Sequence, residues 1–500
     1  DFIAPFQWAL REKNNKLNMI NIANSFQEAQ QAFLLLKQKS SQERVAFLEE
    51  VAKQIELLKE TLIPIAAKES NLTEGRITGE LGRTLGQIRL FSGLVGEGSW
   101  VEAVIDHEDA ERKPVPKPDI RRMLRPLGPV VVFGASNFPL AFSTAGGDTI
   151  SALASGCPVL YKAHPAHPET SRIVAKALQT AVEICQMPKG TFQHIEGGID
   201  TGQELAAHPL AKAIAFTGSF KGGKALFDTC NKRDIPIPVY AEMGSVNPIF
   251  TFEAFLDENL ESAATAYANS LVLGVGQFCT NPGLVFVPKS HEEAFSNQVI
   301  NQLKTVSGAP MLHEGICKTY HEALKNLAIE EKLEWLLTTE ANQLLIGNPS
   351  LAKVKASDWL NEDAFQEEVF GPFAIMVVYD SIEELEDVAI KLKGQLTCTV
   401  WASSKELAEN APFLNLLEER CGRLLFKGVP TGVEVGHAMQ HGGPFPSTTD
   451  SRSTSVGSFA IKRFARPIAY QDMPEGLLPE ELKEDNPLQI LRMVDGEFIR

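Results

Sequence analysis

Apolar segments of strand length alternate with helical segments from about residue 127 onward, and this alternation restricts the fold more than any other feature. The segments LGPVVVFGAS, CPVLYKAH, TFQHIEGG, KAIAFTGS and PVYAEMGS each have the pattern of a buried strand. Helical sequences lie between them, among them FPLAFSTAGGDTISALASG, PETSRIVAKALQTAVEICQ and SFKGGKALFDTCNKR. Because strand–helix–strand units are right-handed and produce parallel sheets, we predict a doubly wound α/β domain of the Rossmann type. Its ligand should bind at the carboxyl ends of the strands.

The same rhythm returns after about Asn247. A long helix over residues 257–274 is followed by the loop VGQFCTNPG and the apolar strand GLVFVP. Further on, AIMVVYD pairs with SIEELEDVAIKLKG, and TCTVWAS pairs with KELAENAPFLNLLEER. These pairs predict a second α/β domain.

The two ends of the chain have other patterns. Residues from Ser25 to about Val95 repeat apolar positions at helical spacing, with a helix start expected at Ser41. The charged and proline-broken stretch HEDAERKPVPKPDIRRMLRP reads as extended chain. In the tail, RPIAYQD and ILRMVDGEFIR are short strands that can add to the sheet of another subunit.

Charge and cysteine usage exclude several classes of function. The formal net charge of −16 repels phosphate backbones, so we expect no nucleic acid partner. The seven cysteines are scattered and form no CxxC pair, which predicts no disulfide framework and no metal site. Free thiols fit a cytoplasmic location. No run of about 18 apolar residues suggests a membrane span, and no signal-type segment opens the sequence, although removal of a leader before Asp1 stays open.

Cys279 is the first candidate for chemistry. It lies in the loop GQFCTNPG, between a helical run and a strand. Backbone amides or nearby charge in such a loop lower the pKa of a thiol and make it a nucleophile. A single cysteine is nevertheless more often an inert, small apolar residue.

Two polar residues follow predicted strands. Glu242, in YAEMGS, ends a strand that should be buried, and it is either a general base or a structural anion in a cap or ion pair. A base beside a thiol activates water to cleave a covalent intermediate. Asn137, in FGASNFPL, either forms a turn or donates its amide to an oxyanion, with the backbone N–H of Cys279 as second donor.

Several weaker signals point to a bound nucleotide. Gly218 and Gly223, in FTGSFKGGK, open a helix whose first N–H groups can hold a phosphate. Lys162, at the end of CPVLYK, is either a ribose or phosphate contact or a solvated lysine. In FQEEVFGP, Glu368 can bind ribose hydroxyls and Phe370 can pack near a nicotinamide ring, although such a segment is usually only a loop.

The elements NFP, FTGS, E-M-G, GQFC and EEVFGP occur in the order and approximate spacing of the aldehyde dehydrogenase superfamily, and the chain resembles that family over nearly its whole length. The stretch GASNFPLAFSTAGGDTISALASGCPVLYKAHPAHPETS looks like a bacterial, NADP-using branch of the family. That branch includes α-ketoglutaric semialdehyde (2,5-dioxopentanoate) dehydrogenases and a long-chain fatty aldehyde dehydrogenase.

The resemblance implies a role for each candidate. Cys279 attacks the aldehyde carbon, Asn137 and the Cys279 amide hold the oxyanion of the thiohemiacetal, and Glu242 activates the water that cleaves the thioester. The remaining implied contacts are to the cofactor, NADP with NAD as the alternative. Lys162 and Glu368 bind its riboses, Phe370 flanks the nicotinamide, and Gly218, Ser219 and Gly223 meet the pyrophosphate.

Two positions depart from the family pattern. Many NAD-preferring relatives carry a glutamate three residues after the lysine, and here that position is Pro165. The missing carboxylate removes a repulsion against a 2′-phosphate, which favours or permits NADP. Arg172 is a candidate partner for that phosphate, with a solvated helix face as the alternative. The usual second glycine after Glu242 is Ser245, which puts the placement of Glu242 in question.

The substrate is expected to be a small aldehyde. Phe138, Phe142, Phe278 and Thr280 should line its channel, and Phe445, in HGGPFPSTTD, should close the mouth. The branch resemblance favours α-ketoglutaric semialdehyde, and a general or long-chain fatty aldehyde is the alternative. An inactive binding or structural homologue, and an acylating enzyme that uses coenzyme A, are the other classes considered.

The resemblance also implies a division of the chain. Residues 1–104 with 127–242 would form the cofactor-binding domain, and 243–455 the catalytic domain. Residues 105–126 with 456–500 would form an oligomerisation arm and tail, which predicts a homodimer or homotetramer.

Overall fold

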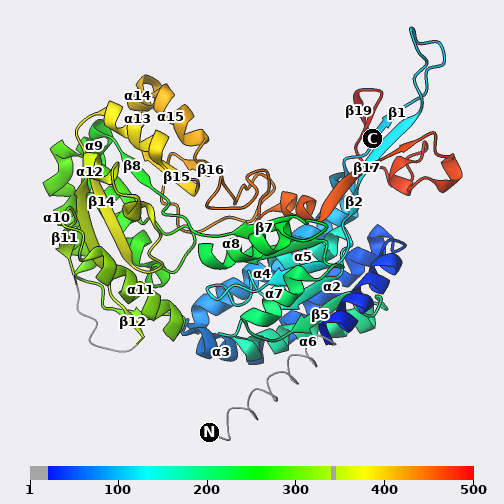
Figure 1. Ribbon diagram of the computed structural model, residues 1–500, viewed down its shortest axis with the longest axis horizontal. Coiled ribbons are helices and arrows are strands. Elements are labelled where there is room, and N and C mark those ends of the chain that lie inside the picture. Colours follow the sequence, from blue (N-terminus) through cyan, green and yellow to red (C-terminus); the bar gives the residue numbers. More distant parts are fainter. Residues whose placement is uncertain (1–20, 339–344) are drawn as a thin grey trace, which may run out of the picture.

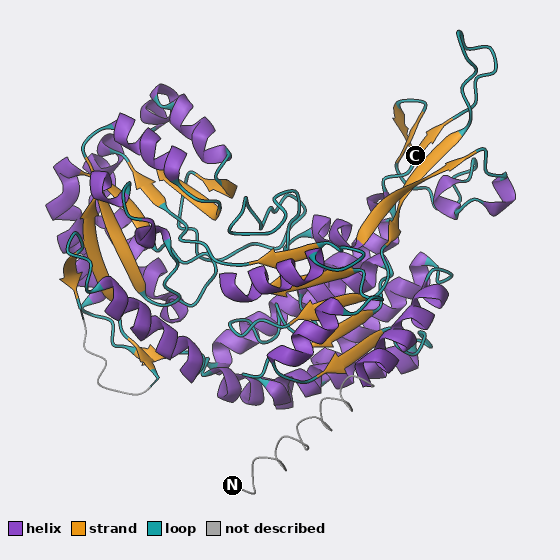
Figure 2. Cartoon of the chain, in the orientation of Figure 1, coloured by secondary structure: helices purple, strands orange, loops and turns teal. Residues whose placement is uncertain are grey.

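The computed structural model describes residues 21–338 and 345–500. Two α/β lobes lie side by side, and a narrow sheet that carries the C-terminus projects from one of them (Figure 1). Helices pack on both sides of the sheets in the two lobes (Figure 2). The predicted α/β class is confirmed, with parallel sheets in both lobes.

The first sheet is built from residues 130–242 and is parallel throughout. In spatial order its strands are β5 Phe192–Ile195, β4 Val159–Lys162, β3 Val130–Phe133, β6 Ala213–Thr217 and β7 Val239–Glu242. The chain order reverses direction between β3 and β6, which makes this the doubly wound sheet that the sequence predicts. The carboxyl ends of β3, β4, β6 and β7 carry or precede Asn137, Lys162, Gly218 and Glu242.

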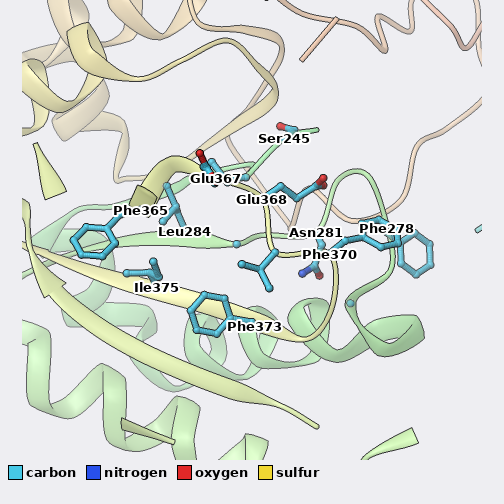
Figure 3. A pocket seen from close by; sticks show the side chains of 14 residues that line it. Ser245, Phe278, Asn281, Leu284, Phe365, Glu367, Glu368, Phe370, Phe373 and Ile375 are labelled. Carbon is cyan, nitrogen blue, oxygen red and sulfur yellow. The ribbon is translucent and has the colours of Figure 1, made fainter. Parts of the chain in front are cut away.

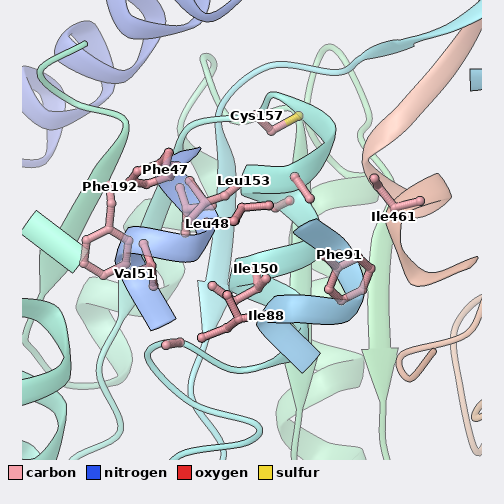
Figure 4. Packing of buried hydrophobic residues seen from close by; sticks show 14 of the residues in the cluster. Phe47, Leu48, Val51, Ile88, Phe91, Ile150, Leu153, Cys157, Phe192 and Ile461 are labelled. Atoms are coloured by element: carbon pink, nitrogen blue, oxygen red, sulfur yellow. The ribbon is translucent and has the colours of Figure 1, made fainter. Parts of the chain in front are cut away.

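Helices cover both faces of this sheet. They are residues 21–36, α2 Ser41–Leu57, α3 Lys59–Ser70, α4 Glu74–Glu97, α5 Gly147–Ser155, α6 Pro168–Ile184, α7 Ile199–Ala207 and α8 Phe220–Asn231. Alternate residues of a strand face opposite sides: Val130 and Val132 pack into the core with α2, α4 and α5, whereas Val131 packs toward α7 and α8. Figure 4 shows the first of these cores, where Phe47, Ile88 and Leu153 lie together.

Two helix starts differ from the prediction. The first is capped by Ser40 rather than Ser41, since the Ser40 side chain accepts from the Glu43 N–H and the Glu43 side chain accepts from the Ser40 N–H. The helix expected over FPLAFSTAGGDTISALASG begins only at Gly147. The N–H groups of Leu140 and Ala141 donate to a carboxylate from α4, so this segment is bound to another helix instead of forming one.

The second lobe is built around a larger sheet from residues 249–425. Its strand order is β11 Glu334–Leu337, β13 Ser350–Lys355, β14 Phe373–Tyr379, β9 Leu284–Pro288, β8 Ile249–Thr251, β15 Gln395–Trp401 and β16 Cys421–Leu425. Only the β11–β13 pair is antiparallel among these described strands. A separate small pair joins β10 Ala309–Pro310 to β12 Ile346–Gly347.

The helices of this lobe are α9 Glu253–Val272, α10 Glu292–Leu303, α11 Glu314–Leu327, α12 Ala356–Trp359, α13 Ile382–Lys391, α14 Ser404–Glu409 and α15 Ala411–Glu418. The single helix expected over KELAENAPFLNLLEER is therefore two. The break falls at Asn410, and Pro412 lies in the first turn of α15, where its missing N–H costs no hydrogen bond.

The projecting sheet joins distant parts of the chain. Its strand order is β17 Ala465–Gln471, β2 Ile120–Pro126, β1 Val104–Asp106, β18 Arg492–Val494 and β19 Glu497–Ile499. The short helix η5 Ser458–Phe464, which precedes β17, packs on α5, and Arg463 Nη2 lies 2.6 Å from Asp148 Oδ1. The division of the chain into functional domains stays a prediction. Among the described residues, no helix is both long and apolar enough to cross a membrane.

Candidate active site

Glu242 lies at the end of β7, where a later segment of the chain covers the strand. It forms an isolated bridge with Thr448, and the N–H of Met243 donates to the Ser447 carbonyl at 2.8 Å. The Glu242 side chain is 3% exposed. A buried carboxylate needs hydrogen-bond donors, and the covering segment supplies them.

Cys279 lies in the loop before β9, and hydrogen bonds from the Asn247 side chain hold this loop in place. The Asn247 amide donates to the carbonyls of Cys279 at 2.8 Å and of Asn281 at 2.9 Å. At the start of the loop, Gly276 has φ +65°, and a Cβ there would lie 2.3 Å from the Gly371 carbonyl. Only glycine fits this position, which presses the cysteine loop against the loop before β14.

His441 joins the cysteine and the glutamate. Its Nε2 lies 3.0 Å from Glu242 Oε1 and 3.5 Å from Cys279 Sγ. The Ser455 hydroxyl donates to the other oxygen of Glu242 at 2.6 Å. A thiol, a carboxylate and two groups that orient the carboxylate therefore meet in one place, which is the arrangement that a nucleophile and a base require.

The electrostatics of this cluster assign the proton. Burial alone would raise the pKa of Glu242, but His441 and Ser455 hold it below its ordinary value. Burial, and then the Glu242 charge, raise the pKa of Cys279 well above its ordinary value. The resting pair is thus a thiol beside a carboxylate. Both short contacts of His441 use Nε2, and an N–H at this atom can donate to Glu242. Glu242 is the group able to accept the thiol proton.

Sequence reasoning missed His441 and Ser455. The segment HGGPFPSTTD drew attention only to its phenylalanine, and the histidine before two glycines was the available signal. The sulfur, nitrogen and carboxylate donors lie within 4.8 Å of one another, a spacing that also suits a metal ion. The expectation of no metal site stays a prediction.

Asn137 reaches the cysteine loop from the first sheet. Its Nδ2 donates to the Gln277 carbonyl at 3.3 Å, two residues before Cys279. Glu80 of α4 accepts the N–H groups of Leu140 and Ala141 at 2.8 and 2.9 Å and so anchors the Asn137 segment. The side-chain amide of Asn137 thus lies at the loop that carries the thiol, as an oxyanion donor requires.

A cavity of about 430 Å³ lies between the two lobes. Its lining includes Ser219, Phe220, Gly244, Glu368 and Phe370. A narrower neighbouring pocket shares Glu368 and Phe370, and in Figure 3 the Glu368 carboxylate points away from the apolar end of that pocket. The Glu368 side chain is open to the cavity but surrounded by protein atoms. This desolvation, and then Glu242, raise the pKa of Glu368 to about 8.

The donor set of this cavity fits a dinucleotide. Ser219 caps α8, and the first N–H groups of a helix bind phosphate. Glu368 offers oxygens to ribose hydroxyls, and the ring of Phe370 offers an apolar wall. Lys162 is not among the residues that line this cavity. It lies at the end of β4, and its Nζ donates to the Ala163 carbonyl at 3.0 Å and keeps further donors for a ribose. Burial lowers the pKa of Lys162.

Two expected phosphate contacts have other surroundings. A Cβ on Gly223 would lie 2.6 Å from Met243 Cγ, so this glycine lets α8 pack closely on β7. Arg172 Nε and Nη2 lie 2.7 and 2.8 Å from the two carboxylate oxygens of Glu196. The guanidinium already has a bidentate partner, and this placement does not support a role for Arg172 toward a phosphate.

Three of the predicted substrate residues form an aromatic group. The ring centroid of Phe138 lies 5.3 Å from that of Phe142 and 5.6 Å from that of Phe278. Thr280 is buried beside Cys279, and its carbonyl accepts from Thr431. Phe445 lies elsewhere: it contacts Phe220 at 5.9 Å, and both its neighbour Pro446 and Phe220 line the cavity between the lobes. The structure therefore does not bring Phe445 to the aromatic group.

The serine after Glu242 has a structural use. Ser245 Oγ lies 2.9 Å from Asn247 Oδ1 and 2.9 Å from Gln395 Oε1, and it accepts the Leu396 N–H at 3.0 Å. Ser245 lies in the segment between β7 and β8 that connects the two lobes. Its buried hydroxyl holds this segment against β15. The departure from glycine is accommodated without displacing Glu242 from His441.

Comparison with known proteins places these features in a family. The model of the aldehyde dehydrogenase family matches residues 13–443. An alpha-ketoglutaric semialdehyde dehydrogenase of Acinetobacter baylyi is 45% identical over 473 residues, which are 94% of this chain and 90% of the relative. Alpha-ketoglutaric semialdehyde dehydrogenase 2 of Azospirillum brasilense is 47% identical over 459 residues, 91% of this chain and 87% of the relative.

Solved structures share the fold at lower identity. Glyceraldehyde-3-phosphate dehydrogenase GapN of Methanocaldococcus jannaschii, complexed with NADP, superposes with a TM-score of 0.77 at 20% identity. That match covers 91% of this chain and 94% of the other. Aldehyde dehydrogenase 21 of Physcomitrella patens, in complex with succinate, gives a TM-score of 0.77 at 18% identity over 92% of each chain. The predicted fold is confirmed.

Proposed function

We propose that this chain oxidises α-ketoglutaric semialdehyde. The chain belongs to the aldehyde dehydrogenase family, and it is an NAD(P)-using oxidoreductase that converts an aldehyde to a carboxylic acid. The two relatives at 45% and 47% identity that carry this name support the proposal. The observation that carries the chemistry is the contact of Cys279, His441 and Glu242.

In the proposed mechanism, Cys279 Sγ forms a bond to the aldehyde carbon as its proton passes to Glu242. The resulting oxyanion accepts hydrogen bonds from the Asn137 amide and from the backbone N–H of Cys279. The nicotinamide cofactor, when bound, supplies the hydride acceptor for this carbon. Glu242, after losing the thiol proton to solvent, takes a proton from water, whose oxygen attacks the thioester. The C–S bond breaks, and the sulfur takes the proton that Glu242 removed from water, which restores the thiol and the carboxylate.

His441 is a positioning residue in this scheme. By donating Nε2–H to Glu242, it favours the ionised carboxylate, which is the form that accepts a proton. Ser455 acts in the same direction on the second oxygen. Both groups therefore keep the base charged in a buried place where a lone carboxylate would take up a proton.

The proposed cofactor contacts follow from the cavity between the lobes. Ser219 and the start of α8 would hold the pyrophosphate, Lys162 and Glu368 the riboses, and Phe370 would flank the nicotinamide. We propose that NADP serves at least as well as NAD, since Pro165 places no carboxylate against a 2′-phosphate. A large preference for NAD in kcat/KM would contradict this.

The substrate proposal is tested by a screen with both cofactors. Formation of reduced cofactor is followed with 2,5-dioxopentanoate and with a series of aliphatic aldehydes. The highest kcat/KM is expected for 2,5-dioxopentanoate. Equal or better use of long aliphatic aldehydes would support the alternative that the aromatic group favours, a general or fatty aldehyde dehydrogenase. Coenzyme A should not raise the rate, because Glu242 already directs the thioester to water.

The organisation of the chain gives further proposals. Residues 1–104 with 127–242 would bind the cofactor, 243–455 would carry the chemistry, and 105–126 with 456–500 would mediate assembly into a homodimer or homotetramer. The seven free thiols support a cytoplasmic site of action.

A further inference from the structure

The helix α4 presents two arginines to the aromatic group around Cys279. Arg76, Glu80 and Arg83 are spaced four and three residues apart, so they share one face of the helix. The guanidinium carbon of Arg76 lies 4.5 Å from the ring centroid of Phe138 and 5.0 Å from that of Phe278. That of Arg83 lies 5.7 Å from Phe138 and 5.4 Å from Phe142.

These two cations are poorly neutralised. Nε and Nη2 of Arg83 are buried and have no hydrogen-bond partner in residues 21–338 and 345–500. Glu80 lies between the two arginines, and its Oε1 accepts hydrogen bonds from the N–H groups of Leu140 and Ala141. Its other oxygen lies 3.9 Å from Arg76 Nη2, too far for a hydrogen bond.

The charge of Arg83 acts on the reaction centre. Burial lowers the pKa of Arg83, and the groups that oppose this effect include Cys279, Glu80 and the exposed Glu434. An unpaired guanidinium removed from water is costly. A partly buried cation with unpartnered nitrogens suits an anion-binding site, and planar guanidinium groups bind carboxylates with two parallel hydrogen bonds.

The position of the arginines identifies the anion. The phosphates of a dinucleotide belong to the start of α8 and the cavity between the lobes, a different set of residues. The arginines instead border Phe138, Phe142 and Phe278, on the side of Cys279 predicted for the aldehyde. An aldehyde that carries a carboxylate at its far end has an apolar middle for the rings and an anion for the arginines.

We propose that Arg83, with Arg76 beside it, binds the distal carboxylate of the aldehyde substrate while Cys279 holds its aldehyde carbon. This inference rests on the proposed oxidation of an aldehyde at Cys279. It assigns the selectivity for aldehyde acids over neutral aldehydes to α4, which lies outside every motif that identified the site.

The test compares three substrates of equal chain length: 2,5-dioxopentanoate, 5-oxopentanoate, which lacks only the keto group, and pentanal, which also lacks the carboxylate. In Arg83→Met, kcat/KM for both acids should fall about 100-fold, chiefly through KM, while that for pentanal changes little. Arg83→Lys should recover part of the loss, because lysine restores the positive charge but not the planar guanidinium that binds a carboxylate with two hydrogen bonds. The control is Arg89→Met, an exposed arginine of the same helix paired with Glu56.

Each outcome bears on one claim. If Arg83→Met lowers the rates with acids and pentanal equally, Arg83 acts on the thiol or on packing, and the carboxylate assignment is overturned. An unchanged ratio of acid to pentanal also overturns it. If the wild type uses 5-oxopentanoate better than 2,5-dioxopentanoate and Arg83→Met lowers both, the proposed substrate fails but the arginine site stands.

A binding measurement removes the dependence on turnover and on folding. Calorimetry with 2-oxoglutarate on Cys279→Ala should show binding that weakens at least about 10-fold when Arg83→Met is added. Thermal melting of each variant checks that the fold is kept. Equal affinity in folded proteins with and without Arg83 would contradict the proposal.

Discussion

The two sides of Cys279 are built from different interactions. Toward Glu242, the thiol meets a hydrogen-bonded group in which His441 and Ser455 each contact one carboxylate oxygen. On the other side, the loop that carries the thiol packs against the rings of Phe138, Phe142 and Phe278, which are held by ring contacts and bordered by arginines.

This difference separates chemistry from selectivity. Hydrogen bonds have narrow geometry, so the polar side fixes one arrangement of nucleophile and base. Ring packing is less directional and tolerates changes of shape at modest cost. Substitutions on the polar side should therefore change kcat with every aldehyde, whereas those on the aromatic side should change the preference among aldehydes.

The largest effect is expected from Cys279→Ala, which removes the only atom that forms a covalent bond to substrate in the proposed mechanism. Activity should fall by about 10⁴-fold or below detection, since the remaining groups cannot replace a nucleophile. Reduced cofactor is measured under saturating substrate. A rate equal to that of the wild type would exclude the covalent mechanism.

Glu242→Gln should separate the two halves of the reaction. Hydride transfer still proceeds once, more slowly because the thiol proton must pass to solvent, and the thioester then accumulates because no base activates water. Turnover should fall about 10³-fold after this burst. Rapid mixing measures the burst, and mass spectrometry of the quenched protein detects acylated Cys279. Full steady-state turnover without a burst would refute the role of Glu242.

His441→Gln tests whether the imidazole acts through Glu242. We expect kcat to fall about 10- to 100-fold with little change in KM, since the hydrogen bond to a buried charge is lost. The acid limb of the pH–rate profile should shift to higher pH, because Glu242 loses a group that holds its pKa below the ordinary value. His437→Gln, at an exposed position of the same segment, is the control. An unchanged pH profile would leave His441 with a packing role only.

The reactivity of the thiol reports the Glu242 charge directly. That charge is the second cause, after burial, of the raised pKa of Cys279. In Glu242→Gln, alkylation of Cys279 by iodoacetamide should therefore reach half its maximum rate at a lower pH than in the wild type. Glu314→Gln, an exposed site on α11, controls for net charge. A midpoint that stays or rises would show that the carboxylate does not control the thiol.

The smallest effect is expected on the aromatic side. Phe142→Leu keeps an apolar side chain but removes a ring that contacts Phe138 and faces Arg83. It should alter KM about 3- to 10-fold, by amounts that differ among aldehydes, and leave kcat nearly unchanged. The same aldehyde series measures it. An equal loss of kcat for every aldehyde would contradict the claim that the aromatic side controls substrate preference and not the chemical step.

Most of the fold was predictable because its signals are local. Short apolar strands between amphipathic helices predict parallel sheets. The structure contains such strands as β3 to β7 in one lobe and as β8, β9, β13, β14, β15 and β16 in the other. The errors fall where tertiary contacts replaced local preference. The segment before Gly147 is not helical because Glu80, 60 residues before Leu140 in the chain, binds the N–H groups of Leu140 and Ala141.

Motifs likewise predicted Cys279, Glu242 and Asn137 as candidates, and the structure brings the three to one loop. His441, Ser455 and Arg83 escaped notice because a lone histidine, serine or arginine gains meaning only from its partners. The side chains of Phe445 and Arg172 contact Phe220 and Glu196, and the roles expected for them stay predictions.

The sequence by itself determined the α/β class and the candidates for nucleophile and base, since apolar periodicity and short motifs lie within a few consecutive residues. Only the tertiary structure decided which groups set the charge on that base and which cations border the aldehyde side. His441 lies 162 positions from Cys279, and Arg83 lies on a helix of the other lobe. Such groups meet because the two lobes lie side by side (Figure 1), not because they are close in sequence.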